Sequence, residues 1–495
     1  MPIMDEPTSL DPQIADSNSE KLVAANCYEG LVRIMADGTI GKGVATDWNI
    51  SDDGLTYTFK LRNNSHWAMF SGHKAVLGEN YEDTFDITVK AEDFKFGIER
   101  TLSEQTDSAD APLFSAVKSI STPDDFTIVF NLSYADDNFL YALTNPGAMP
   151  CDEEFFNLTN GKYGLDAKYL LCNGPFHVSK WTEKTSVKLA KNNEYNGESS
   201  VSPSSVTFYI NNDDSEVADK MNSVTYDVAF LSSSQFSSIE NKKDLNSVAV
   251  QNVTYSFIFN QNDNNYRNKN MRLAFCRSCD TSSLFDSQSD ISKADGIVPP
   301  SCKIGGEDYR NGNAAELLSY DETLAKKNFN DALLELGSSS VETTILCTEQ
   351  YESFVKQMVQ KLQKTLGVKF VSTVKVVSES DLEAAVNDGN YSVAFYPFKA
   401  KSSFAGEIIE GFDQNNIFGY ESDVLSQKIR NIKNNSGSLE GERSAVADAE
   451  NYLVSEAVIM PVFYENSYFV TSKKTSGIYF YSSADNVCFI NAKKS

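Results

Sequence analysis

The sequence predicts an α/β protein built from more than one domain. Its 495 residues exceed what one compact core usually holds and correspond to roughly two to four domains. Early in the chain, apolar and polar residues alternate with a period of two, which is typical of strands with one buried face. In the second half, short apolar segments alternate with amphipathic helical segments, which is the rhythm of β-α units.

The clearest strand pair lies between Trp48 and Arg62. Every second residue from Leu55 to Leu61 is apolar, and Trp48 and Ile50 follow the same alternation upstream. The tetrapeptide Ser51-Asp52-Asp53-Gly54 between the two runs consists of residues that favour turns. The stretch therefore predicts a β-hairpin.

Helices and strands are predicted along the rest of the chain by the same patterns. A helix is expected to begin near Ser17 to Glu20. Further helices are expected at about 90–102, 214–222, 268–275, 321–336, 350–366, 379–387, 421–434 and 440–456. Strands are expected at about 126–132, 206–210, 226–231, 254–260, 341–347, 368–377, 392–396 and 460–464, with a strand-like tail from 467 to 490. The β-α-β order at 206–231 predicts parallel pairing, and domain crossings are expected near Asn173 and at 260–265.

Composition excludes some classes of partner. The formal net charge of −26 argues against nucleic acid, because affinity for phosphates depends on Lys and Arg. Aromatic residues make up 12% of the chain, which fits either large cores or an aromatic-lined ligand pocket. No window approaches 18 consecutive apolar residues, so we expect no membrane-spanning helix. The first residues do not resemble a signal peptide, and if the protein is secreted we expect that segment to have been removed.

The eight cysteines fit no zinc-binding pattern. The one C-x-x-C motif, Cys276 to Cys279, has no second pair at zinc-finger spacing, and three histidines make a His-rich metal site improbable. In an oxidising compartment, Cys151 is expected to pair with Cys172, and Cys302 with Cys276 or Cys279. Free buried thiols are the alternative.

Sequence motifs of the common enzyme classes are absent. The chain contains no P-loop, no dinucleotide fingerprint after a strand, no H-E-x-x-H and no G-x-S-x-G. His66, His73 and His177 lie in no catalytic context and are interpreted as structural. We therefore expect a binding protein without a cofactor rather than an enzyme.

An ordered set of short motifs runs through the whole chain. The set comprises Glu6-Pro7-Thr8-Ser9-Leu10-Asp11-Pro12, Tyr28-Glu29-Gly30-Leu31, the strand Asp53 to Arg62, Ala91-Glu92-Asp93-Phe94, Asn173-Gly174-Pro175-Phe176, Phe257-Ile258-Phe259-Asn260, Met271 to Phe275, Val298-Pro299-Pro300, Tyr309-Arg310 and Ile459-Met460-Pro461-Val462. It resembles the family 5 solute-binding proteins of ABC importers, of the oligopeptide- and dipeptide-binding type.

The resemblance implies a two-lobed, periplasmic-binding-protein-like α/β fold (class II, cluster C) with a small domain inserted in the first lobe. By analogy, residues 1–45, 173–256 and 467–495 form the first lobe, 46–172 the inserted domain and 257–466 the second lobe. The hairpin then belongs to scaffold, and we expect the stretch from Tyr28 to Arg62 to touch little or no ligand.

The resemblance also implies a function outside the cytoplasm. Members capture oligopeptides as the lobes close on them, and deliver them to the membrane permease of an ABC importer. We expect a monomer, held at the surface of a Gram-positive cell as a lipoprotein or free in the periplasm. The alternatives are an oligosaccharide or another small metabolite as ligand and, as a different class, a secreted hydrolase.

Candidate ligand contacts are placed by the same resemblance in loops of both lobes. They are Asp16, Ser17 and Asn18 in the first lobe, and Tyr396, Pro397, Phe398, Asn416, Gly419 and Tyr420 in the second. Peptide-binding relatives usually carry an acid in the segment that reads Phe395 to Lys399 here, where it pairs with the peptide's α-ammonium group. The segment here contains Lys399 and no acid, so Glu407, Asp413 or Asp16 would have to pair with the α-ammonium group instead.

Overall fold

The structure, a computed structural model, divides into two compact units. It describes residues 1–35, 39–136, 138–197, 200–281, 284–285, 290–399, 404–413, 416–435, 438–481 and 486–495. Unit 1 comprises Met1–Ala249 and Tyr468–Ser495, and unit 2 comprises Val250–Ser467. Two long strands, β12 (Leu245–Phe259) and β19 (Ile459–Ser472), carry the chain from one unit to the other. The crossing expected near Asn173 lies inside unit 1, the first change of unit comes at residue 250, and the predicted domain bounds stay a prediction.

The predicted hairpin is confirmed in unit 1. Strand β4 (Ala45–Ile50) pairs antiparallel with β5 (Thr56–Leu61), and Trp48 lies opposite Phe59. β7 (Thr127–Leu132) and β6 (Val117–Asp124) complete a four-stranded antiparallel sheet of order β4-β5-β7-β6. The amphipathic helix α4 (Ala91–Leu102), which lies between β5 and β6 in the sequence, buries the side chains of Phe94 and Ile98. Apart from Ala45, the first residue of β4, all these elements lie within 46–172, whose status as a separate inserted domain stays a prediction.

A second sheet of unit 1 corrects one prediction. Its order is β1 (Pro2–Ile3), β10 (Ser205–Ile210), β9 (Ser186–Lys191) and β8 (Phe176–Thr182). Helix α7 (Asp214–Asn222) leads from β10 to β11 (Val228–Ser232), but β11 pairs with β19 in a different sheet. The predicted parallel pairing of these two strands is wrong, because β1 and β9 occupy both edges of β10.

In unit 2, two layers of helices cover a central sheet. Its strands follow the order β19-β12-β18-β16-β17, where β18 is Val393–Lys399, β16 is Val341–Thr348 and β17 is Phe370–Val377. Phe257 and Phe259 of β12 belong to one hydrophobic core and Ile258 between them to another, as the period of a strand requires.

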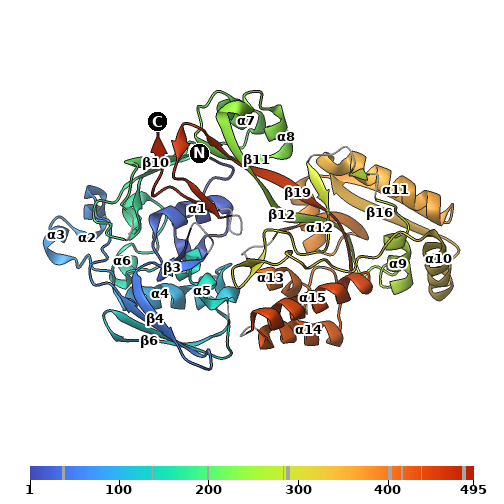
Figure 1. Cartoon of the computed structure of the whole chain (residues 1–495), viewed down its shortest axis with the longest axis horizontal. Helices are drawn as coiled ribbons and strands as arrows, with labels where there is room; N and C mark the ends of the chain where they lie inside the picture. Colours follow the sequence, from blue (N-terminus) through green and yellow to red (C-terminus); the bar gives the residue numbers. More distant parts are fainter. Residues whose placement is uncertain are drawn as a thin grey trace. The chain divides into compact units, whose positions relative to one another are not determined.

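Each core is completed by its own helices. One packs α9 (Lys269–Arg277), α10 (Glu322–Leu336) and α11 (Glu352–Leu366) on the sheet, and the other α12 (Glu379–Asn387), α13 (Ala405–Glu410), α14 (Asp423–Asn434) and α15 (Leu439–Ser455). Figure 1 shows α13, α14 and α15 grouped on one side of the sheet of unit 2 and α11 on the other. Apart from the short α13, these helices were predicted within a few residues.

Shorter elements complete the two units. They are β2 (Val32–Ile34), β3 (Ile40–Lys42), α1 (Asn18–Cys27), α2 (Lys74–Leu77), α3 (Tyr81–Thr84), α5 (Phe139–Ala142), α6 (Glu153–Leu158), α8 (Ser233–Ser238), β13 (Ile291–Lys293), β14 (Lys303–Ile304), β15 (Glu307–Asp308), β20 (Thr475–Ser476), β21 (Tyr479–Tyr481), β22 (Asn486–Cys488) and β23 (Lys493–Lys494). None of the helices in the described ranges is long and apolar enough to cross a bilayer.

All eight cysteines carry free thiols in this structure, and the positions of their side chains disfavour the predicted pairings. Cys302 belongs to one core of unit 2, and Cys276 and Cys279 belong to the other. Cys151 lies with its Sγ 3.5 Å from Nη1 of Arg100, whereas the thiol of Cys172 lies close enough to Cys27 to affect the pKa of that thiol. Among the described residues, no group of three His, Cys, Asp or Glu side chains could hold a metal ion.

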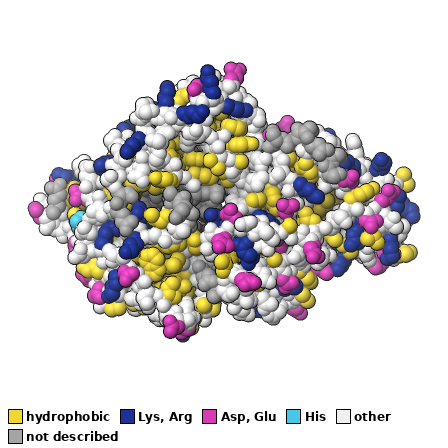
Figure 2. All heavy atoms as spheres, viewed as in Figure 1, with side chains coloured by type: hydrophobic (Ala, Val, Ile, Leu, Met, Phe, Trp, Pro, Cys, Tyr) yellow, Lys and Arg dark blue, Asp and Glu magenta, His cyan; other side chains and the backbone are white. Residues whose placement is uncertain are grey.

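Charges of both signs are interspersed on the surface. On the face drawn in Figure 2, Lys and Arg side chains (dark blue) lie among Asp and Glu (magenta) over unit 2. In unit 1, four exposed lysines gather where β20 pairs with β23: Lys473, Lys474, Lys493 and Lys494. Lys494 forms an ion pair with Asp227 at 2.9 Å, so acids also accompany this group.

Candidate functional site

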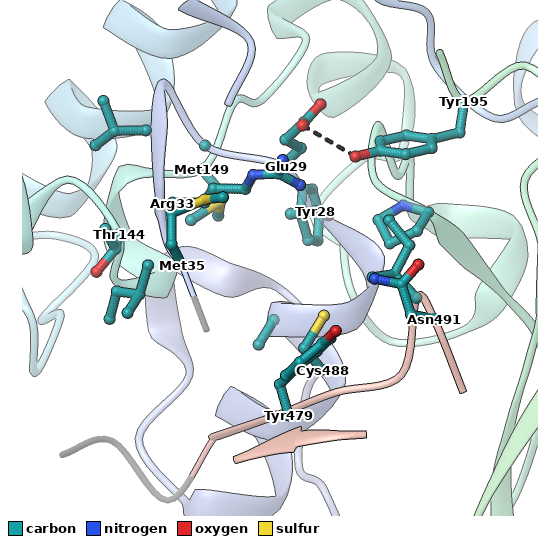
Figure 3. Close-up of a pocket in the computed structure, with 16 residues that line it drawn as sticks. Tyr28, Glu29, Arg33, Met35, Thr144, Met149, Tyr195, Tyr479, Cys488 and Asn491 are labelled. Carbon is teal, nitrogen blue, oxygen red and sulfur yellow. Dashed lines mark hydrogen bonds between the residues drawn. The ribbon is translucent and has the colours of Figure 1, made fainter. Parts of the chain in front are cut away.

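A pocket in unit 1 encloses about 220 Å³. Most of its wall is apolar or aromatic, and a few polar groups converge on it, which is typical of ligand sites. Figure 3 shows Arg33, Met35 and Met149 on one side of this space and Tyr479, Cys488 and Asn491 on the other. The lining residues are Ala25, Tyr28, Glu29, Gly30, Val32, Arg33, Ile34, Met35, Thr144, Met149, Pro175, Tyr195, Tyr479, Cys488, Ile490 and Asn491.

The acid of the pocket, Glu29, is held by three neighbours. Its carboxylate forms an ion pair with Arg62 and accepts a hydrogen bond from the Tyr195 hydroxyl at 3.0 Å, drawn in Figure 3. Its backbone N–H donates to Oδ1 of Asn173 at 3.0 Å, and Nδ2 of Asn173 donates back to the Glu29 carbonyl at 2.8 Å. Because these contacts fix both backbone and side chain, Glu29 is a rigid part of the wall.

Two further groups set the electrostatics of the pocket. Burial, together with the nearby charge of Glu29, raises the pKa of the Tyr195 phenol, so this hydroxyl remains a hydrogen-bond donor at neutral pH. The Arg33 guanidinium lies close enough to oppose that rise in the Tyr195 pKa and to lower the pKa of the Cys488 thiol, which burial raises. A permanent positive charge, the Glu29 carboxylate and a neutral phenol therefore line a space whose remaining wall is largely apolar.

Tight backbone packing positions the strand that carries Arg33. The Gly30 carbonyl oxygen lies beside Gly43 and accepts a hydrogen bond from Val44 N at 2.9 Å. A Cβ atom at Gly43 would lie 2.3 Å from Gly30 O, so this crossing excludes any side chain. Sequence reasoning assigned the stretch from Tyr28 to Arg62 to scaffold, but its first part, residues 28–35, lines the pocket. The presence of two charged residues, Glu29 and Arg33, in a largely apolar segment is the sequence feature that could have indicated this pocket.

The candidates predicted in unit 1 stand at the start of α1, outside the pocket lining. Ser17 is the N-cap, and its Oγ accepts from Glu20 N at 3.2 Å. The Glu20 carboxylate accepts in turn from the backbone N–H groups of Asp16 at 3.1 Å and Ser17 at 3.2 Å. The side chains of Asp16 and Asn18 are exposed. This capping box confirms the predicted helix start, and ligand contact by these residues stays a prediction.

In unit 2, Tyr396, Pro397 and Phe398 lie half-buried on β18. The Phe398 ring stacks on Phe412, with ring centroids 5.9 Å apart and an interplanar angle of 19°. It also stacks on Phe418 at 5.8 Å. The structure thus brings Phe398 of β18 together with Phe412 and with Phe418 of the following loop in one aromatic cluster. Ligand contact by Tyr396, Pro397 or Phe398 stays a prediction.

Asn416 holds that loop together. Its Nδ2 donates to the carbonyl oxygens of Asp413 and Tyr420, each at 2.7 Å, and its Oδ1 accepts from Phe418 N at 3.0 Å. Gly419 follows in the left-handed region, with φ of +63°. The Tyr420 hydroxyl donates to the hydroxyl of Tyr452 at 3.2 Å. The Asn416 amide is therefore committed to loop geometry, and ligand contact by Asn416, Gly419 or Tyr420 stays a prediction.

The comparisons with known proteins agree on the class. The family model of bacterial extracellular solute-binding proteins, family 5 (Middle), matches residues 39–418. The chain belongs to this family. Family 5 proteins bind solutes outside the cytoplasm, and the family is not one of enzymes.

Relatives and solved structures extend over nearly the whole chain. The dipeptide-binding protein DppE of Bacillus subtilis is 24% identical over 496 residues, which cover 96% of this chain and 88% of the relative. A dipeptide-binding protein of Pseudoalteromonas sp. SM9913, solved in complex with Met-Leu, has a TM-score of 0.79 and 17% identity, with 100% of this chain and 99% of the other covered. OppA of Listeria monocytogenes, solved bound to peptide, has a TM-score of 0.76 and 21% identity, with coverages of 98% and 97%. The predicted two-lobed α/β fold class is confirmed.

Proposed function

We propose that this chain captures oligopeptides outside the cytoplasm and delivers them to the permease of an ABC importer. Its membership in the family 5 solute-binding proteins carries the proposal. The names of its relatives, which are dipeptide- and oligopeptide-binding proteins, support peptides as the solute. Closure of the two lobes on the ligand, attachment through a lipid anchor, action as a monomer and the lack of catalytic activity are parts of the same proposal.

The pocket of unit 1 would take one part of the peptide. A cavity of about 150 Å³ already binds a benzene molecule, so about 220 Å³ suits a single aromatic or aliphatic side chain. Arg33 supplies a positive charge for a carboxylate or carbonyl oxygen, and the Tyr195 hydroxyl is already engaged by Glu29. Such a site gives broad acceptance of apolar side chains with modest polar discrimination.

Titration calorimetry and thermal-shift screening with mixed di- to hexapeptides test the proposal. Ligand present at 100 times its Kd should stabilise the protein by about 2.7 kcal/mol. Mass spectrometry of ligand co-purified with the protein identifies the natural cargo. If no peptide shifts the melting temperature and a glycan does, the chain is an oligosaccharide-binding protein and the peptide proposal fails.

Variants test the pocket separately from the function. Arg33→Met should weaken binding of the best peptide by about tenfold, which corresponds to about 1.4 kcal/mol. Arg430→Met, which changes an exposed arginine of α14 in unit 2, is the matched control and should leave the Kd unchanged. Equal affinities of the two variants would remove the pocket from the site while leaving peptide binding intact.

A further inference from the structure

Two buried thiols meet in unit 1 behind the wall of the pocket. Cys27 is the last residue of α1 and is fully buried, and Cys172, which precedes β8, is 1% exposed. The Cys172 thiol lies close enough to the Cys27 thiol to add to the rise of its pKa. No other pair of the described cysteines shows such an effect of one thiol on the pKa of another.

The backbones on either side of the two thiols are also joined. Gly174 N donates to the Cys27 carbonyl oxygen at 2.9 Å, and a Cβ atom at Gly174 would lie 2.7 Å from the carbonyl carbon of Cys27. Next along the chain, Asn173 and Glu29 exchange the pair of hydrogen bonds described above. The two segments therefore run side by side in a fixed register, which keeps the two cysteines close to each other.

We propose that Cys27 and Cys172 form a disulfide bond in the mature extracellular protein. Disulfides form and persist outside the cytoplasm, where this family acts. In the reaction two S–H bonds break and one S–S bond forms. Two electrons and two protons pass to a disulfide oxidant such as oxidised glutathione, whose own S–S bond breaks to give two molecules of reduced glutathione.

The bond would act on the pocket through its wall. Cys27 directly precedes Tyr28 and Glu29, and Pro175 stands three residues after Cys172. Tyr28, Glu29 and Pro175 all line the pocket. A covalent link between these two segments fixes their spacing before any ligand arrives, and such preorganisation favours binding. The inference depends on the extracellular family and on this geometry, and it does not depend on which solute is bound.

Burial determines when the bond can form. Both side chains are inaccessible in folded unit 1, and burial together with the neighbouring thiol raises the pKa of Cys27 well above its usual value. Because the thiolate is the reactive form, oxidation must precede the closing of this core. Folded, reduced protein should therefore react with oxidised glutathione at least about tenfold more slowly than protein that is folding in its presence.

Peptide mapping of the full chain tests the proposal. The protein is produced once by export to a bacterial periplasm and once in a reducing cytoplasm, alkylated in denaturant and digested with trypsin without reduction. The exported protein should give one cross-linked species of the tryptic peptides 22–33 and 169–180. Alkylation of both Cys27 and Cys172 in the exported protein would overturn the proposal. A link from Cys172 to peptide 119–162, which carries Cys151, would do the same.

Thermal melting with and without a reductant provides the second measurement. Reduction should lower the Tm of the exported wild type by about 4 °C or more. Cys151→Ser, which changes another buried cysteine of unit 1, should keep this sensitivity. The Cys27→Ala/Cys172→Ala double variant should lose it, and a double variant that responds to reductant like the wild type would contradict the assignment.

Discussion

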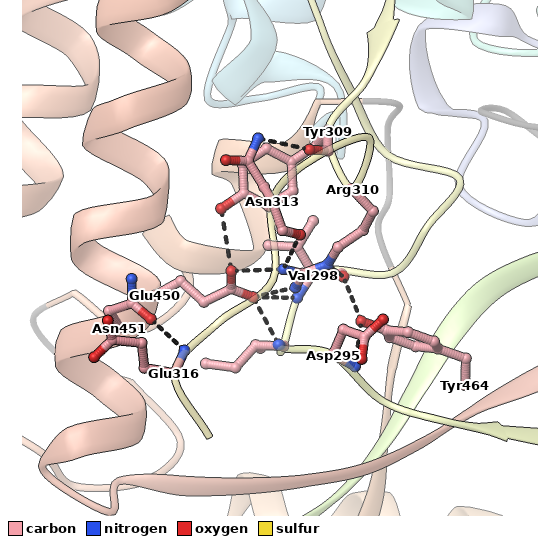
Figure 4. Close-up of polar contacts among 10 residues, drawn as sticks. Asp295, Val298, Tyr309, Arg310, Asn313, Glu316, Glu450, Asn451 and Tyr464 are labelled. Atoms are coloured by element: carbon pink, nitrogen blue, oxygen red, sulfur yellow. Dashed lines mark hydrogen bonds and ion pairs between the residues drawn. The ribbon is translucent and has the colours of Figure 1, made fainter. Parts of the chain in front are cut away.

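Replacement of Glu450 by Gln should destabilise unit 2 strongly. Glu450 lies on α15 and is 1% exposed, and its carboxylate ties the segment 297–310 to that helix (Figure 4). Oε1 accepts from the backbone N–H groups of Ile297 at 2.7 Å and Val298 at 2.9 Å. Oε2 accepts from the Tyr309 hydroxyl at 3.1 Å and from Nη1 of Arg310 at 2.9 Å, and Nη2 of Arg310 contacts Oε1.

The expected loss of stability follows from the hydrogen bonds and the charge that the glutamine amide cannot supply. Glutamine has one acceptor oxygen, so its NH₂ group would take the place of the other carboxylate oxygen and face hydrogen-bond donors there. The Arg310 guanidinium would also remain buried without a counter-charge. Breaking a buried ion pair from one side costs about 3–5 kcal/mol. With a urea m-value of about 2–3 kcal/mol per M, the unfolding midpoint of unit 2 should fall by about 1–2.5 M.

Urea unfolding combined with peptide-level hydrogen exchange of residues 295–316 measures this effect. Glu322→Gln makes the same chemical change at the exposed ion pair with Lys326 and should leave the midpoint almost unchanged. A Glu450→Met/Arg310→Met double variant should be more stable than Glu450→Gln, because it leaves no buried charge unpaired. If Glu450→Gln shifts the midpoint no more than Glu322→Gln does, the reasoning about this buried pair is wrong.

Three further predictions concern unit 1. Burial lowers the pKa of His73 to about 4, below its value in the unfolded chain. Between pH about 6.5 and 4 the unfolded state therefore binds more protons than the folded state. The free energy of unfolding should fall by up to about 3 kcal/mol as the pH drops through that range. His73→Gln should flatten this part of the stability–pH curve, measured by thermal denaturation, whereas His66→Gln should not; equal slopes for the two variants would refute the assignment. Ser17→Ala removes the N-cap of α1 and should cost about 1 kcal/mol in urea unfolding with an unchanged peptide Kd; a weaker Kd without loss of stability would instead make Ser17 a ligand contact. Gly43→Ala places a Cβ atom 2.3 Å from Gly30 O and should lower both Tm and peptide affinity, and a variant that keeps both would show that the crossing can relax.

Local patterns determined much of the secondary structure. The alternation from Leu55 to Leu61 and the turn before it specify the hairpin without help from the rest of the chain. The same holds for the start of α1, because Ser17 and Glu20 satisfy each other within one turn. The ordered motifs also led to the correct family, whose members share these local solutions.

Partners far apart in sequence were decided by tertiary structure alone. The strands β10 and β11 look like neighbours in a β-α-β unit, yet each found another partner, since pairing depends on which sheet edges are free. Cys151 and Cys172 flank one segment, but the register between Glu29 and Asn173 brings Cys27 to Cys172 instead.

The pocket shows the same division. Its wall combines residues from 25–35 and 144–149 with Pro175, Tyr195, Tyr479 and residues from 488–491, and no local pattern in any of these segments predicts the others. The sequence by itself determined the elements and the family, because those depend on spacing along the chain. Only the tertiary structure decided that Glu29 and Arg33 face a cavity rather than solvent, because burial of a charge depends on what the remote segments place beside it.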